Sequence, residues 1–343
     1  MANSSTQHMP YRILPVELDQ DVTSDFARFA QKVTEQDGTP AFSEQTLVEF
    51  AKYNASAETP NSESSVNVIG VFATGEGLTP MGVAVAVLDT KTHSATIEGA
   101  VLSEYRNQGL GAELARALMN ELSHRAIDSY DLWVHQLRSE GESQQRQATQ
   151  KIAQSFGFEP ARELRKLRLE LTESAQKRIE DTFTQTTLPE GITLDTYKVG
   201  HDDAAWLATN AAAFATHPEQ GSLTLDDLRA RQNSDWFDAE GFFVARDEKT
   251  IAGFNWTKIP THQQGETEGE VYAVGISPKW QGKKLGKALT LAGMNYLASA
   301  HDKQNNALTK IVLYVDADNT AAVSLYESLG FETETIDVMY HKN

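Results

Sequence analysis

Apolar and polar positions along the chain follow helix-like and strand-like periods in a definite order. Apolar residues spaced three and four apart predict helices, whereas β-branched runs bounded by turn residues predict strands, three of them in succession as an antiparallel meander. In the first half the predicted elements are two helices within 20–53, strands at 66–72, 81–88 and 93–102, a loop and helix at 103–119, a strand at 132–135, a helix at 147–156 and a strand at 164–171.

The second half repeats this order after a polar stretch, 172–190, that ends in a turn and that we interpret as a linker. Its predicted elements are a strand at 192–197, helices at 204–214 and 225–231, strands at 241–246, 251–258 and 269–277, a loop and helix at 281–300, a strand at 310–315, a helix at 320–329 and a strand at 331–340.

Two motifs align the halves. Arg106-Asn-Gln-Gly-Leu-Gly111 lies over Gln281-Gly-Lys-Lys-Leu-Gly286, an offset of 286 − 111 = 175. Ser155-Phe-Gly-Phe158 lies over Ser328-Leu-Gly-Phe331, an offset of 331 − 158 = 173. Chance similarity in one loop would not bring the flanking elements along in the same order, so the sequence indicates a tandem duplication.

Composition narrows the class of protein. A chain of 343 residues has room for two domains, each with its own core. It contains no cysteine, and its nine histidines lack metal-ligand spacing, so we expect neither disulfides nor a metal site. The net charge of -18 disfavours nucleic acid and anionic membranes as partners. Without an apolar run of membrane-spanning length or a signal peptide, we expect a cytoplasmic protein.

A strand, a Gly/Lys-rich loop and a helix are predicted in the stretch Glu270 to Met294. Such a loop directs backbone N–H groups and the positive end of a helix dipole at one point, which suits a phosphate or pyrophosphate. Lys279, Lys283, Lys284 and Lys287 add positive charge to a strongly acidic chain. The motif alone is also consistent with a shaped turn and a solvated lysine face, but its repetition favours ligand binding.

These motifs resemble a known family. The loop from Arg106 to Gly111, between a predicted strand and helix, is similar to the loop with which GNAT N-acetyltransferases hold the coenzyme A pyrophosphate. The second half resembles the mycothiol synthases, a family of tandem GNAT enzymes. The segments that carry this resemblance are His217-Pro-Glu-Gln-Gly221, Trp236-Phe-Asp238, Gly253-Phe-Asn-Trp-Thr-Lys258, Gly269-Glu-Val-Tyr272 and Leu313-Tyr-Val-Asp-Ala-Asp-Asn-Thr-Ala-Ala-Val323. One departure is Lys284, which stands in place of the first motif glycine.

The resemblance implies an α/β (α+β) fold of two tandem GNAT domains, each with a mixed, mostly antiparallel central sheet flanked by helices. It implies a non-catalytic N-terminal domain at 1–172, a linker at 173–190 and a catalytic domain at 191–343. The implied activity is acetyl-CoA-dependent acetylation of the cysteine amino group of cysteinyl-glucosaminyl-inositol, which forms mycothiol. We expect a monomer whose partners are this small-molecule amine and CoA. The alternatives are a GNAT acetyltransferase of another small amine or peptide N-terminus, and a non-catalytic acetyl-CoA-binding protein.

Two residues acquire catalytic roles from the resemblance. Glu270 would take the proton of the attacking amine, and Tyr326 would protonate the departing thiolate. From the residues alone, Glu270 is equally consistent with an exposed strand glutamate. Tyr326 shares one helical face with Leu325 and Leu329, which favours a packed core position, although its hydroxyl could still reach a site.

The first copy lacks both groups. Carried back by the offsets, Glu270 falls on Ala95 and Tyr326 falls on Ala153. We therefore expect the first copy to bind acetyl-CoA or a related ligand without catalysing transfer, with Glu98 as a substitute carboxylate if the alignment shifts by a few residues.

The resemblance further implies contact residues for both substrates, some of which have plain structural alternatives: Asn319 is placed to be an N-cap, Glu219 to be an exposed turn residue and Glu44 to be a first-turn helix carboxylate. The acetyl-CoA positions of the second half are Val274, Gly275, Ile276, Gln281, Gly282, Lys283, Lys284, Leu285, Gly286, Lys287, Asn319, Thr320, Ala321, Ala322, Val323 and Ser324. Those of the first half are Gly99, Ala100, Val101, Arg106, Asn107, Gln108, Gly109, Leu110, Gly111 and Ala112. The amine-substrate positions are Glu44, Glu219, Lys258, Glu270 and Tyr314.

Overall fold

The computed structural model describes residues 11–16, 20–43, 45–50, 68–75, 80–90, 92–137, 144–215, 218–248, 250–260 and 267–343. Contacts divide the chain into two compact units. Unit 1 comprises Met1–Arg165, Asp316–Asp318 and Glu334–Asn343, and unit 2 comprises Lys166–Val315 and Asn319–Thr333. Each unit has a mixed central sheet with helices on its faces, as the sequence predicts. No helix in the described ranges is both long and apolar enough to cross a membrane.

Unit 1 is built on a sheet with the strand order β1-β2-β3-β4-β5-β12-β6. Strands β4 and β5 are parallel, whereas β1 to β4 form an antiparallel meander and β12 is antiparallel to β5. Its elements are β1 (Arg12–Val16), α1 (Gln20–Asp37), β2 (Val68–Thr74), β3 (Gly82–Asp89), β4 (Ser94–Val101), η1 (Ser103–Tyr105), α3 (Leu110–Ser123), β5 (Ser129–Leu137), α4 (Gln144–Ser155), β6 (Glu159–Glu170), which continues into unit 2, and β12 (Glu332–Lys342).

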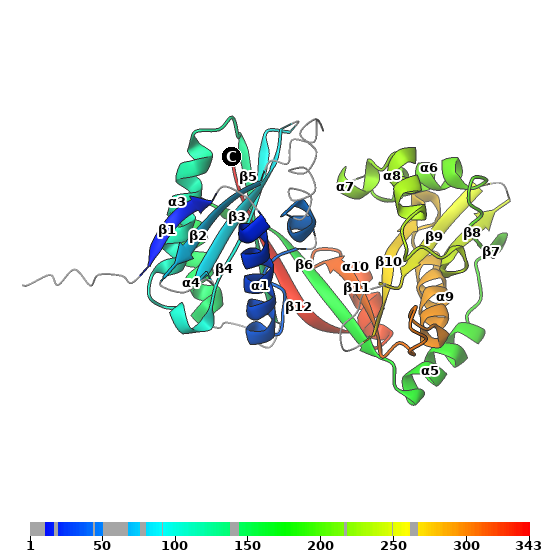
Figure 1. Cartoon of the computed structure of the whole chain (residues 1–343). Coiled ribbons are helices and arrows are strands. Elements are labelled where there is room, and N and C mark those ends of the chain that lie inside the picture. The colour runs from blue at the N-terminus through cyan, green and yellow to red at the C-terminus, as the bar shows by residue number, and fades with distance from the viewer. Residues whose placement is uncertain are drawn as a thin grey trace, which may run out of the picture. The chain divides into compact units, whose positions relative to one another are not determined.

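Helices cover both faces of the sheet of unit 1 (Figure 1). The buried residues of α3 are Leu110, Leu114, Leu118 and Leu122, spaced four apart, so one stripe of the helix packs on one face of the sheet. On the other face, Phe26 and Phe29 of α1 pack with Phe42, Phe50 and the outward side of β3. The two faces thus have separate apolar clusters, and each side chain of β4 belongs to one face or the other.

Unit 2 has the strand order β6-β11-β10-β9-β8-β7. Helix α9 packs with Leu291, Met294 and Leu297 on one face, while the other face carries an aromatic cluster that includes Trp206 and Trp256. Its elements are α5 (Glu173–Thr184), β7 (Ile192–Thr196), α6 (Asp203–Ala213), α7 (Pro218–Gly221), α8 (Leu225–Gln232), η3 (Ala239–Gly241), β8 (Phe242–Asp247), β9 (Thr250–Lys258), β10 (Glu268–Ile276), η4 (Pro278–Trp280), α9 (Leu285–Ser299), β11 (Lys310–Asp316) and α10 (Thr320–Ser328).

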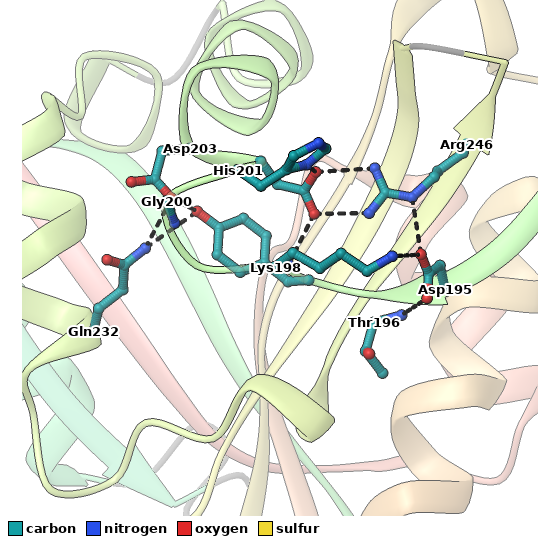
Figure 2. A network of polar contacts seen from close by, with 10 residues as sticks. Asp195, Thr196, Lys198, Gly200, His201, Asp203, Gln232 and Arg246 are labelled. Atoms are coloured by element: carbon teal, nitrogen blue, oxygen red, sulfur yellow. Dashed lines mark hydrogen bonds and ion pairs between the residues drawn. The ribbon is translucent and has the colours of Figure 1, made fainter.

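A polar network fixes the connection between β7 and α6 to the edge of the sheet of unit 2 (Figure 2). Arg246 of β8 donates two hydrogen bonds to Asp202, at 3.0 and 2.7 Å, and one to Asp195 at 3.2 Å. Burial alone would raise the pKa of Asp202, but the hydrogen bonds from Arg246 and His201 lower it to about 2. We interpret this cluster as a structural clamp, because its charges compensate one another.

Two features differ from the sequence-based expectation. The stretch expected to be a linker, 173–190, contains helix α5, which Thr172 caps by accepting a hydrogen bond from the N–H of Ala175. Ala175 and Ile179 are its buried residues, four positions apart within a polar segment. The contact units also differ from the domains expected at 1–172 and 191–343, because β12 pairs with β5 over Thr335 to Lys342.

Candidate functional site

Each unit has a parallel strand pair whose pairing ends partway along the strands. In unit 2, β10 and β11 pair from Glu268 with Lys310 to Val271 with Leu313. In unit 1, β4 and β5 pair over the same number of positions, ending at Ile97. In both units the Gly-containing loop and its helix follow the strand that leaves the pair, so the loop and the separated strand ends share one side of the sheet.

A β-bulge interrupts β10 beside the proposed base. The register with β9 shifts between Val271 and Ala273, which makes Tyr272 the extra residue. The corresponding strand of unit 1, β4, pairs with β3 without a shift. Because a bulge bends a strand and redirects its side chains, this local geometry is a difference between the two copies at the place where the chemistry is expected.

The bulge also changes which residue of unit 1 is equivalent to Glu270. Glu270 is paired with Lys258 of β9, and the matching place in unit 1 is held by Thr96, paired with Val87 of β3. The offset between the copies is thus 270 − 96 = 174 before the bulge and one more after it. Ala95 is therefore wrong by one residue, but the first copy still has no carboxylate at this place.

The two loops have the same backbone conformation. Asn107 and Gly109 have φ of 59° and 87°, and Gly282 and Lys284, offset by 175 residues, have φ of 73° and 63°. Lys284 thus adopts a left-handed conformation where the first copy has glycine. A Cβ built on Gly109 would meet no atom within 4 Å, so the position has space for a side chain, and the lysine keeps the loop shape at the expense of backbone strain.

The first residue of each loop bonds to the strand before it. The Arg106 Nε donates to the carbonyl of Val101 at 2.8 Å, and Gln281 Nε2 donates to the carbonyl of Ile276 at 3.3 Å. Arg106 also forms an ion pair with Asp37 at 2.6 Å. The positive charge expected to serve a pyrophosphate in the first copy is therefore balanced by a protein carboxylate.

The lysines of the second loop lie at the start of α9, where the loop residues 281–284 and Lys287 are exposed. The ammonium of Lys283 lies 4.3 Å from the ring centre of Trp280, and Lys279 contacts the same ring and pairs with Asp247 at 3.0 Å. Backbone N–H groups at the helix start, together with Lys283, Lys284 and Lys287, fit a pyrophosphate by chemistry and exposure. The loop can hold CoA with these groups.

Helix α10 supplies the second part of the predicted site. Asn319 caps it by accepting a hydrogen bond from the N–H of Ala322 at 3.2 Å. Tyr326 is 9% exposed, its ring contacts Phe331, and burial raises the pKa of its hydroxyl to about 12. Within the described part of the chain its hydroxyl makes no hydrogen bond, so it is available to a ligand group.

The ends of the corresponding helices confirm the equivalence of Tyr326 and Ala153. The N–H of Phe331 donates to the carbonyl of Tyr326 at 3.1 Å, and the N–H of Phe158 donates to the carbonyl of Ala153 at the same distance. Ala153 is 1% exposed and belongs to the core of unit 1. The first copy therefore has no hydroxyl at the position of Tyr326.

The predicted amine-substrate residues are only partly described. Lys258 lies with its ammonium over the rings of Trp236 and Tyr272, at 5.4 and 5.8 Å, while Tyr314 on β11 is 48% exposed. The Tyr272 hydroxyl accepts a hydrogen bond from Arg231 at 3.1 Å. Glu44 lies outside the described residues, and Glu219 falls in α7 with its side chain outside them. Trp236, Tyr272 and Arg231 were not predicted, because only the fold brings α8 beside β10.

A cavity of about 680 Å³ lies in unit 1, between the separated ends of β4 and β5 and the start of α3. It is lined by all of the predicted first-copy positions except Gln108. A smaller cavity of about 390 Å³ in unit 2 is lined by Trp236, Tyr296 and His301 and by none of the residues predicted for that unit. The larger of these two cavities is thus in unit 1, the copy that lacks the proton-transfer groups.

Sequence reasoning also missed a polar cluster on the wall of the larger cavity. His135 lies 3.1 Å from Glu98 and 3.1 Å from Asp337. The three residues come from β4, β5 and β12, which are far apart in the sequence, and no local spacing would have revealed them.

Comparison with known proteins agrees with this geometry. The family model described as Acetyltransferase (GNAT) family matches residues 29–141 and 208–331, one region in each half. The chain is 42% identical to the mycothiol acetyltransferase of Rothia mucilaginosa, over 98% of this chain and 94% of that protein. It is 41% identical to the mycothiol acetyltransferase of Renibacterium salmoninarum, over 96% and 90%.

The fold is similar to that of a tandem GNAT protein from the clavulanic acid biosynthesis pathway, with a TM-score of 0.66, 14% identity and coverage of 97% of this chain and 98% of that one. The chain therefore belongs to the GNAT family of acetyl-CoA-dependent N-acetyltransferases, among the tandem enzymes named mycothiol acetyltransferases.

Proposed function

We propose that unit 2 transfers the acetyl group of acetyl-CoA to the cysteine amino group of cysteinyl-glucosaminyl-inositol, which yields mycothiol. The observation that supports this most directly is the difference between the two copies. Both have the anion-binding loop, whereas only the second has a carboxylate at the position of Glu270, which is Thr96 in the first copy, and a buried tyrosine on the following helix. The names of the relatives that match nearly the whole chain support the identity of the acceptor.

Glu270 is the proposed base. It lies on the paired stretch of β10, two residues before the bulge residue Tyr272, with Lys258 directly opposite on β9. An amine must lose its proton to attack a thioester, and a carboxylate can accept that proton directly or through one water. As the amine nitrogen bonds to the acetyl carbon, the carbon–sulfur bond breaks and the thiolate leaves.

Tyr326 is the proposed acid, which returns a proton to that thiolate. Its ring is held by packing in the core of unit 2, so the hydroxyl has a defined position. A pKa of about 12 keeps the hydroxyl protonated through the whole range in which an enzyme works, which a proton donor requires.

Replacing Glu270 by glutamine tests the base. We expect Glu270→Gln to lower kcat by about 10²- to 10⁴-fold, because the amide cannot accept the proton, with little change in acetyl-CoA affinity. Steady-state kinetics and calorimetric binding measure both quantities. Glu332→Gln, which changes an exposed strand glutamate, is the matched control and should behave as the wild type. Normal turnover by Glu270→Gln would remove this residue from the mechanism.

Replacing Tyr326 by phenylalanine tests the acid. The ring packing is kept, so we expect a near-normal melting temperature together with a lower kcat at every pH in the working range. Tyr340→Phe alters another buried tyrosine, which lies in unit 1, and serves as the control. A wild-type kcat for Tyr326→Phe would show that the proton comes from elsewhere.

The acceptor is tested with a panel of amines. We expect the highest kcat/KM for cysteinyl-glucosaminyl-inositol, and lower values for cysteine, for an aminoglycoside and for a peptide with a free N-terminus. A higher value for one of the other amines would keep the acetyltransferase activity and change its substrate.

For unit 1 we propose binding of acetyl-CoA or a related thioester without transfer. The conserved shape of its loop and the cavity beside it support binding, and Thr96 and Ala153 at the two proton-transfer positions argue against catalysis.

A further inference from the structure

The cavity of unit 1 has one wall on each face of the sheet. Ala95 and Ile97 of β4 pack in the cluster that contains α3, whereas Ala100 packs in the cluster that contains α1. Because side chains alternate along a strand, Glu98 lies on the same side as Ala100, facing α1. On β5, Leu132 and Val134 pack on the α3 side, so His135 also faces α1.

On the α1 face these two side chains meet across the gap between the separated strands. His135 Nε2 lies 3.1 Å from Glu98 Oε1, and His135 Nδ1 lies 3.1 Å from Asp337 on β12. The N–H of Ser43 donates to both oxygens of Glu98, at 3.1 Å each. Asp37 at the end of α1 and Thr39, Pro40 and Ala41 in the connection after it also line the cavity. We call the set Glu98, His135, Asp337 and Ser43 the polar bridge.

The hydrogen-bonding capacity of the bridge is used within the bridge. Glu98 is 1% exposed and each of its oxygens accepts at least one hydrogen bond. Burial lowers the pKa of His135, but the hydrogen bonds to Asp337 and Glu98 outweigh this and raise it to about 9. The imidazolium then donates both of its N–H groups and has no lone pair to accept a proton. Both ring nitrogens of His135 are thus engaged by carboxylates, which is the geometry of a closed wall.

At the matching place in the second copy, β10 has Ala273 where β4 has Glu98, and the residue at the position of His135 is Asp316, which forms an ion pair with Arg162. The residue after the last paired position of β11 is Tyr314, which is 48% exposed. In unit 1 the residue after the last paired position of β5 is Trp133, which is partly buried, with its ring parallel to that of His135. The first copy thus has the Glu98–His135 contact and a partly buried Trp133 at the places where the second copy has Ala273 and an exposed Tyr314.

We propose that the polar bridge closes the acceptor face of the unit 1 cavity, so that a thioester held there is shielded from nucleophiles. This inference rests on the proposed binding of acetyl-CoA in unit 1. It explains why the first copy would not transfer the acetyl group, independently of the missing glutamate and tyrosine. It also predicts that the bound thioester does not react even with small nucleophiles that need no catalytic base.

Hydroxylamine is a suitable probe. Its nitrogen attacks the acetyl carbon, the carbon–sulfur bond breaks, and a proton from nitrogen ends on the sulfur, which gives acetohydroxamate and CoA thiol. Full-length protein with Glu270→Gln is loaded with labelled acetyl-CoA, and the bound equivalents are counted. The rate of acetohydroxamate formation is then compared with the rate of acetyl-CoA dissociation, measured by a chase with unlabelled acetyl-CoA.

With the bridge intact, we expect two bound equivalents, of which one reacts no faster than it dissociates. In the Glu98→Ala and His135→Ala variants of the same protein, we expect that equivalent to react at least about tenfold faster than it dissociates, a difference of more than 1.4 kcal/mol in barrier. His135→Ala leaves the contact between Ser43 and Glu98 in place, so it tests the wall even if Glu98→Ala fails to fold.

His341→Ala is the matched control. His341 and Asp131 form the same type of cross-strand pair between β12 and β5, at 2.7 Å, and neither residue lines the cavity. This variant should keep the slow equivalent.

Three experimental outcomes would contradict different parts of the proposal. One bound equivalent at the outset would contradict the proposed ligand of unit 1. Two equivalents with both bridge variants still limited by dissociation would overturn the wall. A reaction that exceeds dissociation in the intact protein and slows in the bridge variants would show that the cluster transfers protons, which is the opposite of the inference.

Discussion

Single residues show where sequence reasoning reached the site and where it stopped. Glu270 and Tyr326 could be singled out because they lie near recognisable loop and helix motifs, and the structure places them on β10 and α10 as expected. The polar bridge could not be predicted, because His135 and Asp337 become neighbours only through the pairing of β5 with β12. Arg106 was predicted correctly as a loop residue, but its ion pair with Asp37 depends on the fold.

His135 links the stability of unit 1 to pH. Its folded-state pKa of about 9 lies above the ordinary value of 6.5, so its stabilisation is complete below pH 6.5 and is lost as the pH rises to 9. With the side chain 14% exposed, the stabilisation is on the order of 3 kcal/mol. Urea unfolding of the wild type should therefore show a lower midpoint at pH 9 than at pH 6.5.

His135→Gln removes the titrating group, so we expect most of this pH dependence to disappear. A control is His341→Gln, because His341 is more exposed and its hydrogen bond to Asp131 is screened by solvent. Equal pH dependence in His135→Gln and the wild type would assign the effect to other groups.

At the level of elements, the phosphate-loop units were predicted well because their signal is local. A strand, a turn with residues of positive φ and an apolar helix stripe all occur within the stretches Ser94–Ser123 and Glu268–Ser299, the second of which repeats the first. Helix α5 was missed because most of its residues are polar and only Ala175 and Ile179 mark its buried side. The bulge at Tyr272 was also missed, since a one-residue insertion resembles ordinary alignment drift.

The loop before α9 contains a residue whose backbone conformation is strained, and a substitution there can relieve the strain. Lys284 has φ of 63°, a conformation that is unfavourable for residues with a Cβ by about 1–2 kcal/mol. We expect Lys284→Gly to raise the melting temperature of the unit 2 transition by a few degrees, measured by calorimetry.

The same substitution at Lys287 is the control. Lys287 has the same charge but lies in the first turn of α9, where glycine costs about 1 kcal/mol relative to alanine, so Lys287→Gly should lower the melting temperature. A melting temperature for Lys284→Gly at or below that of the wild type would mean that the lysine side chain contributes more than its backbone strain removes.

At the level of the whole molecule, the duplication predicted the content of each half but not the connection of the strands. The pattern correctly predicted a strand near the end of the chain, now β12. Periodicity reports that a strand exists and which face is apolar, but not which neighbour it pairs with. The pairing of β12 with β5 is therefore a result of the structure alone.

This pairing predicts the effect of shortening the chain. Removal of residues 334–343 deletes the strand between β5 and β6, so we expect faster hydrogen exchange in β5 and a lower melting transition for unit 1. Exchange in β8 and β9 of unit 2 is the internal control and should change little. Wild-type protection of β5 in the shortened chain would show that β12 adds nothing to unit 1.

The position of β12 has a consequence for synthesis of the protein on the ribosome. The partner of β5 is made about 200 residues later, and at 5–20 residues per second the delay is on the order of 10–40 seconds. During this time one side of β5 has unsatisfied backbone groups that can pair with another nascent chain. The sheet of unit 1 therefore depends on the codons for β12, and a chain that stops before them leaves β5 without this partner.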